Sequence, residues 1–201
     1  MNKTICLALT GASGMPYGLR LLECLLGAGC SVQVLHSQAA QIVARQEMDL
    51  ELPTRPAEAK AALLTRYPAV DPEKLAVFGR EEWFAPVASG SNPPDTMVVC
   101  PCSMGTLAAI AHGLADNLIE RAADVVLKEG RKLILVPRET PLSAIHLENM
   151  LRLARAGAVI LPPSPGFYHH PQTVADVVDF VVARVLDQLA VPHALMRRWG
   201  E

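Results

Sequence analysis

The sequence predicts a doubly wound α/β fold, in which helices cover both faces of a mostly parallel, Rossmann-like sheet. Short apolar runs typical of buried strands alternate with helix-like segments along the 201 residues. The composition is 51% hydrophobic but only 4% aromatic, so aliphatic side chains must form most of the core. Such composition suits a parallel sheet buried on both faces. We expect residues 1–201 to form a single domain.

Each strand is expected where a short apolar run stops at a glycine, proline or polar turn. These runs are residues 5–9, 31–35, 75–78, 96–100, 132–136 and 158–161. Helices are expected between them, from capping residues and from helical spacing of apolar side chains. The helices comprise one after Gly14 and then residues 38–46, 57–66, 104–112, 118–129, 143–155 and 173–189. In such sheets ligands bind beyond the carboxyl ends of the strands, so the loops after the strands are the candidate site.

The first of these loops is a glycine turn, Thr10-Gly11-Ala12-Ser13-Gly14, which follows directly on the first strand. Unpaired backbone amides and the positive end of a helix dipole make such a turn attractive to an anion. A further glycine, Gly18, is expected to let the helix pack closely on the sheet. The G-x-x-G-x-x-x-G spacing does not match the dinucleotide fingerprint. The turn therefore predicts a phosphate site without identifying the ligand.

The second strand ends in His36-Ser37, where a dinucleotide-binding fold would be expected to carry an acidic residue for a ribose hydroxyl. The hydroxyl of Ser37 suits a terminal phosphate instead. Capping of the following helix by Ser37 is an equally good interpretation, and the two are compatible. Together with the glycine turn, this end of the strand favours a mononucleotide, with flavin mononucleotide (FMN) the leading candidate.

Charge and cysteine content exclude several classes of function. The formal net charge is −2, so general attraction to nucleic acid is not expected. The five cysteines are not spaced as a metal site, and no secretory segment precedes Met1, so we expect free thiols in a cytoplasmic protein. No apolar stretch is long enough to span a bilayer.

A second strand–turn–helix motif follows the fourth strand, at Cys102-Ser103-Met104-Gly105-Thr106. Its hydroxyls and amides are expected to form another nest for an anion or a carbonyl group. Plain helix capping by Ser103 explains the motif nearly as well.

Cations near the predicted loops suggest a second phosphorylated ligand. Arg121 and Lys128 lie seven residues apart, hence on one face of a helix, and Arg138 follows a strand. Arg184 interrupts an apolar run, where a charge without a partner is costly. Taken singly, a solvated helix face explains Arg121 better, and an ion pair with Asp124 four residues earlier explains Lys128 better. With Tyr168, the four cations exceed what one nucleotide phosphate needs.

Two acids and two tryptophans complete the candidates. Glu47 ends the second helix and Glu139 follows Arg138; either could transfer protons if partly desolvated, although solvated carboxylates are the commoner case. Trp83 and Trp199 could stack on a flat ring or an allylic chain, or seal a contact between subunits.

Six motifs, in the same order, resemble the UbiX/Pad1 family of flavin prenyltransferases. They are TGASG (10–14), CPCS (100–103), NLIERAADV (117–125), PRETP (137–141), HLENM (146–150) and PGFY (165–168). The match runs to the tail at 198–200. The resemblance implies a Rossmann-like flavoprotein that joins a dimethylallyl group from dimethylallyl monophosphate to N5 and C6 of reduced FMN, without a metal ion. The prenylated FMN would then serve a partner UbiD-type decarboxylase.

The resemblance also implies roles for individual residues. The expected FMN contacts are Gly11, Ala12, Ser13, Ser37, Ser103, Met104, Gly105, Thr106 and Arg138. Those expected at the donor phosphate are Ser89, Gly90, Arg121, Lys128, Tyr168 and Arg184. Proton transfer would fall to Ser13 and Glu47, with Glu139 near the leaving phosphate, while Trp83 and Trp199 would shield the allylic cation.

Two other functions fit parts of the sequence. One is an FMN-dependent decarboxylase of the cysteinyl-peptide type, in which the surplus cations would have no function. The other is a flavodoxin-like electron carrier, which would be more acidic around its flavin than a chain of pI near 6.3. The apolar surplus suggests a homo-oligomer with shared sites, and the resemblance implies a dodecamer.

Overall fold

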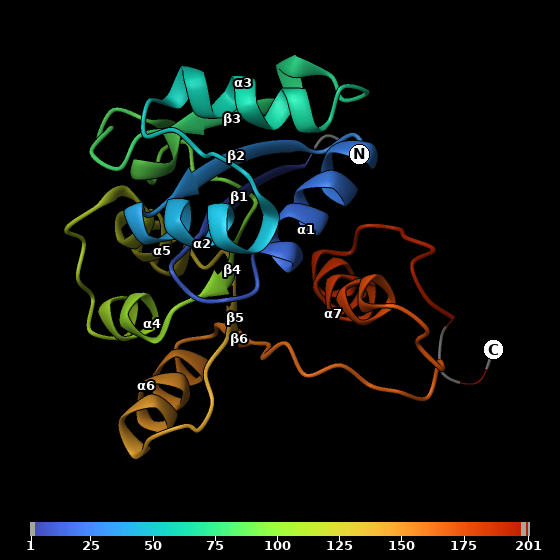
Figure 1. Cartoon of the computed structure of the whole chain (residues 1–201). Coiled ribbons are helices and arrows are strands. Elements are labelled where there is room, and N and C mark those ends of the chain that lie inside the picture. The colour runs from blue at the N-terminus through green and yellow to red at the C-terminus, as the bar shows by residue number, and fades with distance from the viewer. Residues whose placement is uncertain (1–2, 198–199, 201) are drawn as a thin grey trace.

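The computed structural model describes residues 3–197 and 200, and these contain a six-stranded parallel sheet (Figure 1). The strand order is β3-β2-β1-β4-β5-β6, and every neighbouring pair is parallel. The strands are β1 (Thr4–Leu9), β2 (Ser31–His36), β3 (Leu75–Phe78), β4 (Thr96–Cys102), β5 (Lys132–Pro137) and β6 (Val159–Ile160). The predicted doubly wound fold is confirmed.

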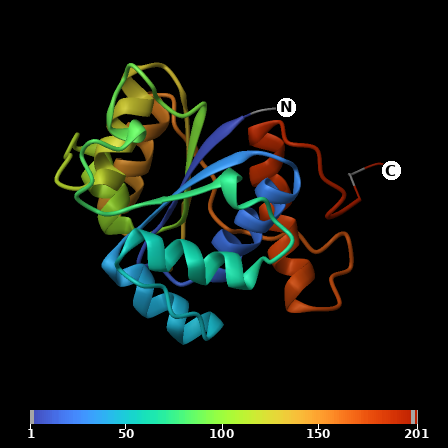
Figure 2. The same ribbon diagram turned by 90° about the horizontal axis from the view of Figure 1, so that it is seen from above.

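Helices cover both faces of the sheet, as the view from above shows (Figure 2). One face carries α1 (Met15–Gly27), α2 (Gln38–Met48), α3 (Pro56–Arg66) and α7 (Val174–Leu189). The other face carries α4 (Met104–Ala111), α5 (Leu118–Lys128) and α6 (Ala144–Arg155). The short 3-10 helices η1 (Pro72–Lys74) and η2 (Pro86–Ala88) flank β3 along the chain. Within the described residues, no helix has both the length and the apolar character to cross a membrane.

The site is expected where the winding of the sheet reverses. The chain runs outward from β1 to β2 and β3, and then returns to place β4 on the other side of β1. The loops after β1 and β4 consequently leave the sheet towards opposite faces, and a crevice opens between their carboxyl ends. The glycine turn and the Ser103 turn are those two loops.

Helix α1 packs against the strands because Gly18 has no side chain. A Cβ at this position would lie closer than 3.0 Å to the carbonyl oxygen of Cys100 and to Leu9. The role expected of Gly18 is therefore confirmed: β4 and the start of α1 approach each other too closely for any larger residue.

Strands β4 and β6 differ from expectation by two residues each, and the other strands by one residue at most. Strand β4 continues through Pro101 and Cys102, where a turn was predicted, because both the amide (3.2 Å) and the hydroxyl (2.8 Å) of Thr10 donate to the Pro101 carbonyl. Strand β6 is shorter than the predicted 158–161. The two prolines that follow Leu161 have no N–H group to donate, which stops the pairing.

Candidate functional site

The turns after β1 and β4 are joined by one buried hydroxyl. Besides donating to Pro101, the Thr10 side chain accepts a hydrogen bond from the Ser103 amide at 2.8 Å. This contact fixes the start of α4 relative to the glycine turn. Thr10 was not among the predicted site residues; its position between an apolar strand and a glycine was the available signal.

The glycine turn has the shape that only glycine allows. At Gly11 a Cβ would lie closer than 3.0 Å to the Cβ of Ala39, so the turn contacts the first turn of α2. At Gly14 φ is +120°, a conformation that L-residues rarely adopt. The turn is thereby held against both neighbouring helices.

The anion at the start of α1 is the chain's own carboxylate. Glu47 accepts hydrogen bonds from the amides of Gly14 (2.9 Å) and Met15 (2.8 Å). The expectation of a phosphate at this helix end is wrong for these two amides, because a side chain 33 positions away already binds them. What remains for a ligand is the exposed outer side of the turn, at Gly11 and Ser13.

Glu47 is held in its charged form. Partial burial would raise its pKa, but hydrogen bonds from the Ser13 side chain and the Gly14 and Met15 amides, together with the charge of Arg138, outweigh burial and lower the pKa. Glu47 and Ser13, the two residues expected to transfer protons, are thus in direct contact. Arg138 also donates through Nε to the Ser13 carbonyl oxygen at 3.1 Å.

Two further helices begin at this crevice. The Ser37 side chain caps α2 by accepting from the Ala40 amide (3.1 Å), and the Ser103 side chain caps α4 by accepting from the Thr106 amide (3.3 Å). The capping interpretation of both serines is confirmed. Capping leaves earlier amides of each first turn without an intrahelical partner, and those amides attract anions.

The donor set around the crevice fits the phosphate of FMN. It combines two helix N-termini, the hydroxyls of Ser37, Ser103 and Thr106, and the guanidinium of Arg138. Ala12 and Met104 are buried beneath these groups, whereas Gly105 is exposed and a Cβ there would meet no other atom. One copy of the chain therefore gathers all the residues expected to contact FMN.

A second group of predicted residues lies along α5. Arg121 donates to the Ala88 carbonyl oxygen (3.1 Å) and forms an ion pair with Asp124 (2.8 Å). Lys128 pairs with Glu129, and its Nζ would lie 2.7 Å from a Cβ built on Gly90. The predicted alternative for Lys128, an ion pair with Asp124, is wrong, because Arg121 occupies that carboxylate instead.

A third group lies beside β6 and α7. The Tyr168 ring meets Phe180 edge-on, with 5.7 Å between ring centroids. Arg184 and Phe180 line the same open cavity of about 340 Å³, which includes β6 and Ser164. Contrary to expectation, Arg184 is neither buried nor unpaired: its side chain is 49% exposed and it binds Asp187 at 2.7 Å.

The cations expected at one pocket are therefore separated within a single copy. Helices α5 and α7 run antiparallel to the strands, so Lys128 and Arg184 lie in the halves directed towards the amino edge of the sheet. The glycine turn lies at the carboxyl edge. Within one copy, Lys128 and Arg184 therefore do not lie beside the glycine turn.

The remaining predicted residues lie on the surface or outside the described part of the chain. Glu139 is exposed and accepts from the Thr140 amide at 3.2 Å. Ser89 is hydrogen-bonded to Ser91 through their side-chain oxygens, and Trp83 is 45% exposed. Trp199 lies outside the described residues.

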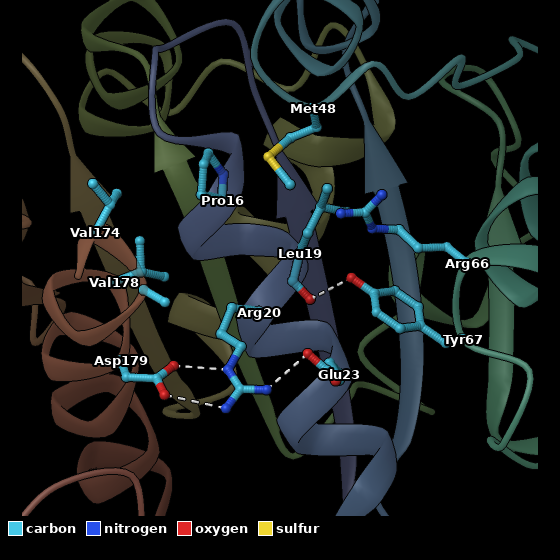
Figure 3. Close-up of a pocket in the computed structure, with 11 residues that line it drawn as sticks. Pro16, Leu19, Arg20, Glu23, Met48, Arg66, Tyr67, Val174, Val178 and Asp179 are labelled. Atoms are coloured by element: carbon cyan, nitrogen blue, oxygen red, sulfur yellow. Dashed lines mark hydrogen bonds and ion pairs between the residues drawn. The ribbon is translucent and has the colours of Figure 1, made fainter.

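Sequence reasoning did not find a cavity of about 390 Å³ on the outer side of α1 (Figure 3). Arg20 crosses it to bind Asp179 of α7 at 2.7 Å, and Tyr67 donates to the Leu19 carbonyl oxygen at 2.9 Å. These contacts tie α1 to α7 and to the end of α3. None of the predicted site residues that the structure describes lines this cavity.

Comparisons with known proteins agree with this geometry. The Flavoprotein family model matches residues 1–186. A flavin prenyltransferase UbiX from Pseudomonas aeruginosa is 58% identical over 197 residues, which cover 98% of this chain and 94% of that protein. A crystal structure of AnUbiX (PadA1) with FMN and dimethylallyl pyrophosphate aligns with a TM-score of 0.87 at 40% identity, covering 100% and 99% of the two chains. A dodecameric FMN-dependent UbiX-like decarboxylase from Escherichia coli O157:H7 aligns with a TM-score of 0.85 at 44% identity, covering 98% and 100%.

The parallel sheet is that of a flavoprotein, and the chain belongs to the Flavoprotein family. Within that family it is a member of the flavin prenyltransferases of the UbiX type, as its identity over almost the full length shows.

Proposed function

We propose that this chain transfers a dimethylallyl group from dimethylallyl monophosphate to N5 and C6 of reduced FMN. The observation that carries the proposal is the contact of Glu47 and Ser13 beside Arg138, at the crevice where we expect the flavin phosphate. The reduced flavin supplies an electron-rich ring as the acceptor. Ring closure at C6 releases a proton, so a carboxylate and a hydroxyl beside that ring have a defined task.

Glu47 can receive that proton because it is ionised at neutral pH, although its lowered pKa makes it a weaker base than an ordinary carboxylate. Ser13 lies between Glu47 and the open side of the turn, where its hydroxyl can pass a proton inward. Arg138 and the hydroxyls of Ser37, Ser103 and Thr106 would hold the flavin phosphate, which fixes the ring relative to both proton carriers.

The donor phosphate would be held by cations from neighbouring copies. Lys128 and Arg184 lie away from the crevice in one copy, so we propose that assembly brings them to it, together with Arg121 and Tyr168. Helix α6 supports such an assembly because Ile145, Leu147 and Leu151 on it are 50–69% exposed. We propose a homo-oligomer, a dodecamer as in the E. coli O157:H7 relative.

Bond breaking at the donor develops negative charge on the departing phosphate. We propose that cations of the chain neutralise this charge in place of a metal ion. Ser89 and Gly90 would add hydrogen bonds, and Glu139 would act near the leaving phosphate. Trp83 and Trp199 would shield the allylic cation from water. The product would pass to a UbiD-type decarboxylase in the cytoplasm.

The name of the E. coli O157:H7 relative supports a second candidate, an FMN-dependent decarboxylase. One experiment separates the two. The protein is incubated anaerobically with reduced FMN and either dimethylallyl monophosphate or dimethylallyl pyrophosphate, and the flavin mass is read. We expect a gain of one five-carbon unit with the monophosphate. A flavin of unchanged mass with both donors, together with carbon dioxide release from an aromatic or cysteinyl acid, would establish the decarboxylase instead.

A further inference from the structure

Arg184, Asp187 and His193, at the end of α7 and in the segment after it, form a series of hydrogen bonds. The proposed function assigns no role to Asp187 or His193. One carboxylate oxygen of Asp187 binds Arg184 NH1 at 2.7 Å, and the other lies 3.1 Å from His193 Nε2. The Leu195 amide donates to His193 Nδ1 at 3.4 Å, so Nδ1 accepts and Nε2–H donates to Asp187. The three side chains thus connect the segment after α7, through Asp187, to the guanidinium of Arg184.

The fold brings the tail back to α7 by a sharp reversal. Ala190 has φ 50° and ends the helix in the left-handed conformation, after which Val191 is buried in the core. Lys3 donates to the Leu189 carbonyl oxygen at 2.7 Å and so fixes the same helix end from β1. His193 thereby lies against Asp187 with its side chain only 7% exposed.

An exposed ion pair three residues apart on a helix contributes little by itself. Here the carboxylate is fixed on both sides, because the second oxygen of Asp187 is held by a buried imidazole. The guanidinium of Arg184 is a planar fork whose direction decides what it can bind. With NH1 fixed at Asp187, the fork keeps one orientation at the cavity that Arg184 shares with Phe180 and Ser164.

We propose that Asp187 and His193 are positioning residues that orient Arg184 towards the phosphate of the prenyl donor. The inference rests on the proposed function, which assigns Arg184 to that phosphate. Asp187 fixes the side chain through charge and hydrogen bonding, and His193 fixes Asp187. Both act on donor binding through Arg184 and touch neither the flavin nor the acids at the glycine turn.

The test compares four variants in the full-length assembly. Asp187→Asn removes the charge at constant shape. His193→Leu removes the donor to Asp187, whereas His193→Gln keeps an amide N–H near the position of Nε2. Glu58→Gln is the matched control, because Arg55 and Glu58 form an ion pair of the same spacing on α3, away from all predicted residues.

For each variant, kcat, KM for dimethylallyl monophosphate, FMN affinity, Tm and particle size are measured. We expect Asp187→Asn and His193→Leu to raise the donor KM about fivefold to tenfold, as loss of a positioned charge pair should. FMN affinity and particle size should stay at the parental values. His193→Gln should restore most of the donor affinity, and Glu58→Gln should leave it unchanged.

Three results would overturn the inference. The donor KM of Asp187→Asn could equal or fall below the parental value, FMN affinity could decline in parallel with donor affinity, or His193→Gln could behave like His193→Leu. If Asp187→Asn does not fold, the comparison of the two His193 variants decides alone. A parental protein that adds no five-carbon unit to the flavin refutes the proposed function, and that result is separate from any difference between variants.

Discussion

The glycine-turn region and the α7 region differ in how their charged side chains are paired and buried. At the glycine turn, one copy of the chain supplies the acid, the amides that bind it and the neighbouring guanidinium, Arg138. Along α7, Arg184 is half-exposed and is paired with Asp187 of its own helix. The difference supports the proposal that the flavin half of the site is built within one chain, whereas the donor half is completed by assembly.

The largest effect is expected from removing the acid of the flavin half. Glu47→Gln keeps hydrogen-bonding capacity towards the Gly14 amide but cannot accept a proton. We expect single-turnover prenylation to slow by about 10² to 10⁴-fold, the usual contribution of a general base, while FMN still binds. Glu51→Gln, at an exposed position just beyond α2, is the control. Prenylation at the parental rate by Glu47→Gln would exclude the proton-transfer role.

The close approach of α1 to β4 supports the flavin half of the site. A single added methyl group should disrupt it. Gly18→Ala places a methyl group against the Cys100 carbonyl oxygen, and overpacking of this kind costs about 2–3 kcal/mol. Gly27→Ala, on the same helix with no atom within 4 Å of the added Cβ, is the matched control and should not destabilise. Urea denaturation gives both free energies of unfolding. Equal values for the two variants would show that α1 can move away from the sheet without cost.

The sequence predicted local contacts better than contacts between segments that are distant along the chain. The capping roles of Ser37 and Ser103 were predicted correctly, because a serine before a helix acts on the amides of the next turn. The close packing at Gly18 was also predicted, although the strand that it contacts, β4, is distant in sequence. The contact of Glu47 with the Gly14 amide could not be predicted, since it joins two segments whose distance only the folded sheet determines.

Pairing among the charged residues was the least predictable feature. Asp124 lies within reach of both Arg121 and Lys128, and helical spacing alone does not decide between them. Arg184 was expected to be buried because its neighbours in sequence are apolar. In the fold it lies on the side of α7 next to β6, a strand of two residues that leaves this side open.

Mixing two inactive variants tests whether the two halves come from different copies. Glu47→Gln is defective in the flavin half and Lys128→Ala in the donor half. If a site takes these residues from different copies, co-assembly from equal amounts should restore about a quarter of parental activity, because each contribution is intact in half of the copies. If both residues act within one copy, each site has one defect and activity stays at the level of the separate variants.

The dependence of stability on pH also compares the glycine-turn region with the α7 region. Each region has a carboxylate that caps the start of a helix. Glu47 binds the first amides of α1, and Asp176 binds the Gln172 and Thr173 amides at the start of α7. The pKa of Asp176 is lowered, first by the Gln172 amide and then by that of Thr173, and the pKa of Glu47 is lowered below its ordinary value of 4.5.

A lowered pKa in the folded state means that the unfolded chain takes up the proton first as the pH falls. Each cap therefore contributes stability that is fully present above the ordinary pKa and is lost as the pH falls through the lowered value. We expect Glu47→Gln and Asp176→Asn to be less stable than the parent at pH 7. The difference should shrink below about pH 4.5 for Glu47 and below about pH 3.8 for Asp176, as the parental carboxylates protonate. Urea denaturation between pH 7 and about pH 2 measures this convergence. The two variants should differ in prenylation, which only Glu47→Gln should slow strongly, since Asp176 caps a helix without touching the proton carriers. A stability difference that stayed constant down to about pH 2 would mean that these carboxylates are not the charged caps described here.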